Sequence, residues 1–329
     1  MRAVALLLVV LVLSSGCLQF GAPDRTSWAF TSTGLEALHD EGFDGSGVQV
    51  AVIDTGIDPS HPSLKGVRIV AWKDVPGGQA DPYDLDGHGT YVAGLVAGHG
   101  PMRGGAPGVD LIVVKVFDED TRSTDAWVAD GIRFAVEKGA DVIGLSLGGD
   151  SFPLLGTATE DAARDATSRG ILVVAAAGNE GPDNADVRSP ANVASVIAVA
   201  ASGRSREVAD FSSRGSTSSG VMLGLGTPRS APDQKPEIAA PGVDIVGPWK
   251  NGGHVTASGT SSAVPFVVSA LALMLEIHPA ARPQNVDGVG EVKQWLMDSA
   301  ADVPGAQGPH DRAAGYGYLD ARALVERTG

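Results

Sequence analysis

Cysteine is almost absent from this sequence, and clustered basic residues are absent altogether. Cys17 is the single cysteine among 329 residues, so no disulfide bond can form within the chain. The formal net charge is −15, and no run of lysine and arginine occurs anywhere. Because nucleic-acid binding depends on basic clusters that neutralise phosphates, the sequence argues against a nucleic-acid partner.

Aromatic residues are also scarce, at 5% of the chain, whereas glycine is abundant, with 44 residues. This balance suits a fold with many tight turns and small residues where elements cross closely. Hydrophobic residues make up 43% and charged residues 19%, which argues against overall disorder. Beyond the N-terminal segment, no hydrophobic run is expected to span a membrane.

The N-terminal segment has the pattern of an export signal. Arg2 precedes an apolar run over residues 3–13, and small residues follow at 14–16, directly before Cys17. This resembles the cleavage box of prokaryotic lipoproteins, although Leu13 lies four places before the cysteine and the box usually has leucine three places before it. We expect a lipoprotein signal over residues 1–17, with Cys17 as the lipidated residue and the protein outside the cytoplasmic membrane. An ordinary cleaved signal or an uncleaved anchor is the alternative.

One catalytic domain over residues 31–329 is expected after a polar tether at 18–30, because no linker or shift of composition divides the later region. A short helix should come first, with Thr33 as its N-cap. Apolar runs typical of buried strands then alternate with helical segments. The predicted strands are Val48–Ile53, Leu111–Val116, Asp141–Leu147, Ile171–Ala176 and Val196–Ala200, and the predicted helices between them are Thr90–Ala97, Ala126–Lys138 and Glu160–Ser168. The pattern predicts an α/β fold, a three-layer sandwich with a mostly parallel central sheet.

Three short motifs supply an aspartate, a histidine and a serine in that order. They are VIDTG with Asp54, GHGT with His88 and SGTSSAVP with Ser261. Asp54 directly follows a predicted strand, and His88 stands between glycines before a predicted helix. Ser261 opens an apolar helical segment, where the helix dipole favours developing negative charge. These three residue types make a serine hydroxyl nucleophilic when the fold brings them together.

Each candidate has an ordinary structural interpretation when it is taken alone. Ser261 would be a helix N-cap, His88 a turn histidine and Asp54 a turn aspartate. Asp58 and His61 compete as carboxylate and imidazole, but they lie in a proline-containing loop. Near the end of a strand, AAAGNEGP adds an asparagine, whose amide can donate to an oxyanion. That residue, Asn179, makes a fourth matching context, and the four together favour the catalytic interpretation.

Further motifs accompany these four, namely GAP at 105–107, SLGG at 146–149, FSSRG at 211–215, KPEIAAPG at 235–242 and GYG at 315–317. With these motifs in this order, the chain resembles the subtilisin (subtilase) family of serine peptidases over about residues 33–325. The order Asp, His, Ser along the chain is that of the subtilisins. The resemblance implies that Asp54, His88 and Ser261 form the catalytic triad. It also implies that Asn179 donates to the oxyanion.

The same resemblance implies two substrate-binding segments. Ser146, Leu147 and Gly148 would pair with an extended substrate backbone. Ala176, Ala177 and Gly178 would wall the pocket for the side chain before the scissile bond. Because these walls are small and uncharged, an apolar or broad preference is expected.

The sequence departs from the family pattern at three positions near the motifs. Ser262 replaces the methionine that usually follows the nucleophile, and Tyr91 and Phe266 each replace a histidine. The loop at 98–104 is short and has no carboxylate, so the calcium site of many relatives is expected to be absent here. No cofactor or metal is expected to be required, and the sequence leaves calcium elsewhere open. The short stretch before Thr33 leads us to expect folding without a pro-region.

The predicted function is that of an exported serine endopeptidase that acts on protein or peptide substrates and is tethered to the membrane by a lipid. Two alternatives remain from the sequence. One is a catalytically silent subtilase fold used for binding. The other is an esterase, although residues 259–263 lack the final glycine of the GxSxG elbow.

Overall fold

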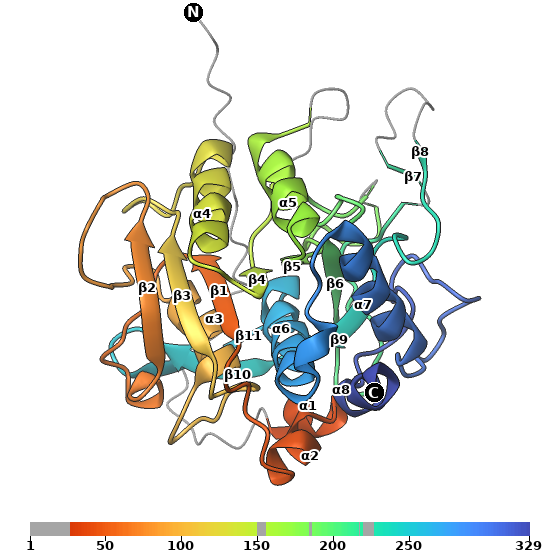
Figure 1. Ribbon diagram of the computed structural model, residues 1–329, viewed down its shortest axis with the longest axis horizontal. Coiled ribbons are helices and arrows are strands. Elements are labelled where there is room, and N and C mark those ends of the chain that lie inside the picture. The colour runs from red at the N-terminus through yellow and green to blue at the C-terminus, as the bar shows by residue number, and fades with distance from the viewer. Residues whose placement is uncertain (1–26, 150–155, 184–185, 217, 220–226) are drawn as a thin grey trace, which may run out of the picture.

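The computed structural model describes residues 27–149, 156–183, 186–216, 218–219 and 227–329 (Figure 1). The predicted export signal at 1–17, with Cys17, and most of the predicted tether lie outside these described residues. Helix α1 (Ser27–Ser32) begins within the stretch assigned to the tether.

A seven-stranded sheet forms the centre of the molecule, with the strand order β2-β3-β1-β4-β5-β6-β9 and only parallel pairs. Its strands are β1 (Gln49–Asp54), β2 (Arg68–Asp74), β3 (Asp110–Lys115), β4 (Val142–Leu145), β5 (Leu172–Ala176), β6 (Ile197–Ser202) and β9 (Ile238–Pro241). The predicted α/β sandwich is therefore confirmed. Five of the strands are the ones that the apolar runs predicted.

Helices cover both faces of this sheet (Figure 1). Alternate side chains of a strand enter different cores, as Val50 and Val52 of β1 do on one face and Ala51 and Ile53 on the other. Helices α4 (Asp125–Glu137) and α5 (Ala158–Ser168) cover the second face. Helices α3 (His88–Ala97), α6 (Thr260–Ile277) and α8 (Ala321–Thr328) lie on the first. Strands that are apolar at every position are thus explained by burial on both sides.

Helix α6 is the centre of the first core. Among the described residues it is the helix long and apolar enough to cross a membrane by composition, but 83% of that stretch is buried inside the molecule. Its apolar character therefore fits a core helix packed against β4, β5 and β6. Ser261, which was predicted to open it, is its second residue.

Several elements were not predicted, because their patterns are weak. Strand β2 lies at the sheet edge and is half-exposed, and the hairpin of β10 (Ile245–Trp249) and β11 (Gly253–Ala257) is short. The others are the strand β9, the helices α7 (Val286–Asp298) and α8, the two-residue strands β7 (Ser218–Ser219) and β8 (Thr227–Pro228), and the 3₁₀ turns η2 (Pro62–Leu64) and η3 (Pro279–Ala281).

The predicted N-cap at Thr33 is wrong. Helix α2 (Leu35–Asp40) begins after Gly34, whose φ of 75° places it in the left-handed region. The Thr33 hydroxyl instead donates to the Ala29 carbonyl at 2.7 Å, so it closes α1. A threonine bonded to the preceding turn cannot cap the following helix.

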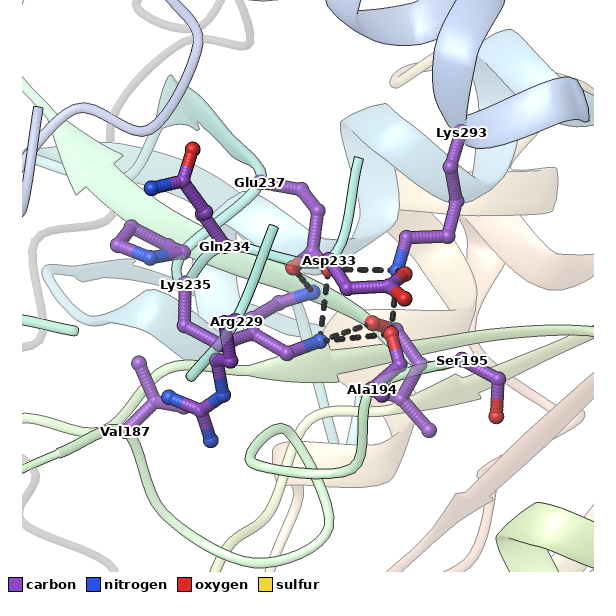
Figure 2. A network of polar contacts seen from close by, with 12 residues as sticks. Val187, Ala194, Ser195, Arg229, Asp233, Gln234, Lys235, Glu237 and Lys293 are labelled. Carbon is purple, nitrogen blue, oxygen red and sulfur yellow. Dashed lines mark hydrogen bonds and ion pairs between the residues drawn. The ribbon is translucent and has the colours of Figure 1, made fainter. Parts of the chain in front are cut away.

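A buried polar network joins α7 to the far edge of the sheet (Figure 2). Glu237, directly before β9, accepts from Lys235 Nζ at 2.7 Å and from Lys293 Nζ of α7 at 2.9 Å. Its other oxygen accepts from the backbone N–H of Ala198 in β6, at 2.8 Å. Both ammonium groups also donate to the carbonyl of Ala194. One carboxylate thus links two strands, a loop and a helix.

Candidate active site

The functional candidates meet at the carboxyl edge of the sheet, where β1, β4 and β5 are neighbours. Asp54 ends β1, Ser146 directly follows β4 and Asn179 comes three residues after β5. From β1 the chain runs outward to β2 and β3, and then returns to β4 on the other side of β1. In open parallel sheets such a reversal leaves a crevice beyond the strand ends, which is where ligands bind.

Asp54 and His88 are in direct contact. His88 Nδ1 lies 2.7 Å from Asp54 Oδ1, and the two side chains are 2% and 1% exposed. Because the Asp54 carboxylate accepts a hydrogen bond from Nδ1–H, the proton stays on Nδ1, and this tautomer leaves Nε2 free to act as a base. Nε2 is buried and has no hydrogen-bond partner in the structure.

The electrostatic surroundings of His88 favour its protonated form. Burial lowers the pKa of His88, but the charge and hydrogen bond of Asp54, together with the charges of Asp86 and Asp84, raise it above its ordinary value of 6.5 overall. An imidazole with a raised pKa is a stronger base and stabilises the imidazolium that forms during proton transfer.

Asp84 holds the two motifs against each other, a role that no sequence motif indicates. Its carboxylate accepts from the hydroxyl of Thr55, which follows Asp54, at 3.0 Å, and from the N–H of Gly87 at 2.8 Å. It also accepts from the N–H and hydroxyl of Thr90, at 2.9 and 2.7 Å. Asp84 therefore caps the start of α3, where backbone N–H groups lack helical partners. In the sequence Asp84 is only an aspartate four residues before His88, and this spacing does not predict its contacts with Thr55 and α3.

Glycine permits the close approach of these two segments. A Cβ added to Gly89, the residue after His88, would lie 2.1 Å from the backbone oxygen of Gly56. Such a distance is impossible for real atoms, so any side chain at Gly89 would push α3 away from the end of β1. The Thr55 hydroxyl accepts from the Gly89 N–H at 2.8 Å across this same contact.

Ser261 and Asn179 lie next to each other. A Cβ on Gly259 would be 3.1 Å from Ser261 Oγ and 3.5 Å from Asn179 Nδ2. Asn179 Oδ1 accepts from the N–H of Thr260 at 2.9 Å and from its hydroxyl at 3.0 Å. Because an N–H can only donate, the oxygen of the amide faces Thr260 and the NH₂ group faces away from it. A hydrogen-bond donor is thus oriented beside the serine hydroxyl.

Pro265 explains how Ser146 is attached to this place. In an α-helix residue 265 would donate to the carbonyl of residue 261, but proline has no N–H. The Ser261 carbonyl instead accepts from the hydroxyl of Ser146 at 3.0 Å. The missing helical bond therefore joins the segment after β4 to the predicted nucleophile.

The two adjacent serines have different surroundings. Ser262 is 1% exposed and accepts from the hydroxyl of Tyr91 at 2.8 Å, whereas Ser261 is partly exposed. Two departures from the family pattern, at 91 and 262, thus contact each other and connect α3 to α6. Ser261 itself makes no hydrogen bond to His88 in this structure, since His88 Nε2 has no partner.

Neither competing residue is placed to act as a base. His61 Nδ1 accepts from the N–H of Ser63 at 3.0 Å, and its Nε2 lies 2.8 Å from the carbonyl of Gly253. Asp58 accepts from Ser60 and, at 2.8 Å, from the N–H of Asn251. Both are used in holding the loop after β1 against the β10–β11 hairpin.

The two predicted substrate-binding segments are both attached to the start of α6 by hydrogen bonds. Ser146, Leu147, Ala176 and Ala177 are buried, whereas Gly148 and Gly178 are partly exposed. The N–H of Gly178 donates to the Thr260 hydroxyl at 3.2 Å, which ties the second segment to the start of α6. Among the described residues, no three His, Cys, Asp or Glu side chains gather in a way that could hold a metal ion.

The comparisons with known proteins agree with this arrangement. The subtilase family pattern matches residues 45–317. Subtilisin E of Bacillus subtilis (strain 168) is 41% identical over 249 residues, which are 74% of this chain and 59% of that protein. Serine protease AprX of the same organism is 35% identical over 311 residues, covering 80% of this chain and 66% of that protein.

A solved structure shows the same fold. The Prenylagaramide maturation protease PagA superposes with a TM-score of 0.71 at 28% identity, and the match covers 90% of this chain and 98% of that one. The chain spans about three fifths of the length of the first subtilisins that it matches. On the family match, the identities and the shared fold, the chain belongs to the subtilase (subtilisin) family of serine peptidases.

Proposed function

We propose that this protein is a serine endopeptidase that hydrolyses peptide bonds in protein or peptide substrates. The observation that carries the proposal is the buried hydrogen bond between Asp54 and His88 at the sheet edge where Ser261 and Asn179 lie side by side. Asp54, His88 and Ser261 are the proposed triad.

In the proposed reaction, Ser261 Oγ attacks the carbonyl carbon of the scissile bond while His88 Nε2 takes its proton. Asp54 keeps the imidazole in the required tautomer and stabilises the imidazolium. His88 then gives the proton to the leaving amine, and an acyl-enzyme remains on Ser261. Water, activated by the same histidine, hydrolyses this ester and restores the serine.

The negative charge that develops on the substrate oxygen is stabilised by two groups. The Asn179 amide is oriented toward it by Thr260, and the N-terminus of the 18-residue helix α6 adds the positive end of its dipole. Removing one such side-chain donor typically costs about 10²–10³-fold in kcat. No cofactor has a step in this scheme, so activity is expected to survive treatment with a chelator.

The location of the protein is the second part of the proposal. The relationship to the subtilisins supports a place outside the cytoplasm. The export signal at 1–17 and lipidation of Cys17 would add attachment to the membrane surface. Metabolic labelling with a fatty acid in a bacterial host, compared between the natural sequence and Cys17→Ser, tests this part independently of the activity.

A fluorophosphonate probe tests the proposed chemistry, because it reacts covalently with activated serines. We expect stoichiometric labelling, loss of labelling in His88→Ala, and cleavage of a denatured protein substrate that the probe abolishes. A chain that binds peptides but is neither labelled nor able to cleave would instead be a silent binding protein.

A further inference from the structure

An arginine lies between the two proposed substrate-binding segments. The backbone N–H of Arg188 donates to the carbonyl of Ala177 at 2.9 Å. The next residue, Ser189, forms an antiparallel bridge with Gly149, with reciprocal bonds of 3.0 and 3.1 Å. The backbone at 188–189 is therefore fixed to both segments and holds them at a constant separation.

The stem of the Arg188 side chain occupies space left by two glycines. A Cβ added to Gly148 would lie 3.0 Å from Arg188 Cβ, and one added to Gly178 would lie 2.7 Å from Arg188 Cγ. Gly148 and Gly178 belong to opposite walls of the crevice. The first carbons of the side chain, Cβ and Cγ, therefore lie beside both glycines, and the side chain is 28% exposed.

The guanidinium group is held at this place by Glu180, the residue after Asn179. Arg188 Nη2 lies 3.0 Å from Glu180 Oε1, and Glu180 Oε2 accepts from the hydroxyl of Ser213 at 2.8 Å. Burial lowers the pKa of Arg188, but an arginine with a lowered pKa is still cationic at neutral pH. A positioned, partly buried cation therefore borders the crevice.

The same crevice leads to the predicted nucleophile. Ser146 is bonded to the Ser261 carbonyl, and Gly178 is bonded to the Thr260 hydroxyl, so both walls end at the start of α6. A substrate chain lying between the walls with its carbonyl at Ser261 places the side chain before the scissile bond toward Arg188. This argument rests on the proposed peptidase function.

From this geometry we infer that Arg188 is a specificity-determining residue that selects substrates with a carboxylate side chain, glutamate or aspartate, directly before the scissile bond. The planar guanidinium has five N–H donors and forms charge-assisted hydrogen bonds with carboxylates. Such bonds are stronger than neutral ones, and in a partly desolvated crevice they discriminate by about 10-fold to 100-fold. A lysine at the same substrate position meets a like charge and is disfavoured.

The test compares three p-nitroanilide peptides that differ only in the residue before the cleaved bond, namely glutamate, leucine and lysine. We expect kcat/KM for glutamate to exceed the values for leucine and lysine by about tenfold or more. Arg188→Ala should abolish this advantage and leave kcat/KM for the leucine peptide within a few-fold of the original value. Arg188→Lys should keep part of it. Added salt should weaken the preference in the original enzyme.

The matched control is Arg133→Ala, which removes an exposed arginine paired with Asp130 on α4, at 2.8 Å, and should leave all three ratios unchanged. Equal cleavage of the glutamate and leucine peptides by the original enzyme, or an unchanged ratio in Arg188→Ala, would overturn the inference while the peptidase function stands. Failure to cleave any peptide, together with no fluorophosphonate labelling, would overturn both.

Discussion

At the scale of single residues, the two adjacent serines differ in their contacts, and these contacts support Ser261 as the proposed nucleophile and a structural role for Ser262. The hydroxyl of Ser262 is buried and accepts from Tyr91, so it is occupied between α3 and α6. Ser261 is partly exposed beside the Asn179 amide, where a substrate carbonyl can reach it. Chemically identical groups one residue apart are thus given different tasks by their surroundings.

The first prediction concerns these serines. Ser261→Ala should lower kcat by a factor on the order of 10⁶, because the whole acyl-transfer route depends on this hydroxyl. Ser262→Ala should keep activity within about tenfold and destabilise the protein by about 1 kcal/mol, since it removes one buried hydrogen bond. Active-site titration and urea unfolding measure the two effects. Loss of activity only in Ser262→Ala would refute the assignment.

The second prediction concerns the charge of Asp86. Its Oδ1 accepts from the His88 N–H at 3.1 Å, and its charge contributes to the raised pKa of His88. Activity requires the neutral imidazole, so a raised pKa moves the acid limb of the pH profile upward. Asp86→Asn keeps the acceptor oxygen but removes the charge, and should shift the acid limb of kcat/KM to lower pH.

Exposed Asp287 on α7 provides the control for this shift. Asp287→Asn changes the net charge equally on a helix that packs against α5 and α8, and should leave the pH profile in place. A shift of the same size in both variants would show that the effect comes from the total charge and not from the proximity of Asp86.

At the scale of elements, the site depends on how two helix starts meet the sheet edge. Helix α3 begins at His88 and α6 at Thr260, and the Tyr91–Ser262 contact joins their first turns. Asp84 caps the first, while Asn179 and Ser146 are bonded to residues at the start of the second. The first N–H groups of a helix have no partner within the helix, and the Ser261 carbonyl has none because residue 265 is proline. These groups are the ones that bind the side chains of Asp84, Asn179 and Ser146.

The third prediction therefore concerns Asp84. Asp84→Ala should lower kcat/KM by at least tenfold, because it releases α3 and Thr55 together and displaces His88 relative to Asp54. It should also destabilise the protein by about 1–2 kcal/mol, as loss of a helix cap does. Steady-state kinetics and urea unfolding give the two values.

Asp320→Ala is the matched control, since Asp320 caps α8 by accepting from the Ala323 N–H at 3.0 Å, away from the site. It should cost similar stability and leave kcat/KM unchanged. If both variants lose activity in proportion to their loss of stability, Asp84 has only a structural role.

At the scale of the whole molecule, polar side chains gather at two separate places on the sheet. The carboxyl ends of β1, β4 and β5 carry the proposed catalytic groups, whereas the outermost strand β9 adjoins the buried network of Lys235, Lys293 and Glu237 (Figure 2). Burial lowers the pKa of Lys235 to about 7, an effect that Lys293 strengthens and Glu237 opposes. The desolvation cost therefore favours the neutral amine of Lys235 in the folded chain at pH values above about 7.

The fourth prediction follows from this lysine. Between pH 7 and its ordinary pKa of 10.5, the unfolded chain keeps a proton on Lys235 that the folded chain has lost. The free energy of unfolding should therefore rise with pH in this window, by at most about 1.4 kcal/mol per pH unit from this group. Lys235→Met should remove that part of the slope.

Urea unfolding at pH 7, 8 and 9 measures the slope, with Ser261→Ala as the background so that self-digestion does not interfere. The background chain is expected to gain stability over this range, and the chain that also carries Lys235→Met is expected to gain less. Parallel pH dependences in the two chains would show that Lys235 keeps its ordinary pKa in the fold.

The sequence predicted the fold wherever burial leaves a strong pattern. Strands β1, β3, β4, β5 and β6 are apolar on both faces and were located within one or two residues, whereas half-exposed β2 and short β9 were not recognised. The sequence also showed the order of Asp54, His88 and Ser261 and the glycines around them. These glycines can be recognised because the backbone segments approach so closely that no side chain fits there.

Only the tertiary structure decided which side chains meet. Asp84 and Arg188 carry no motif, and each acquires its place from partners distant in sequence, such as Thr55 for the first and Gly148 for the second. From the sequence, only small residues were predicted as walls of the crevice, and an apolar or broad preference was therefore expected. The sequence does not reveal that Gly148 and Gly178 leave room for the side chain of Arg188. The sequence by itself determined the strands, the helices and the order of the candidate catalytic residues, because these follow from local patterns. Only the packed sheet decided which charged side chains border the crevice, because that depends on distances between residues far apart in the chain.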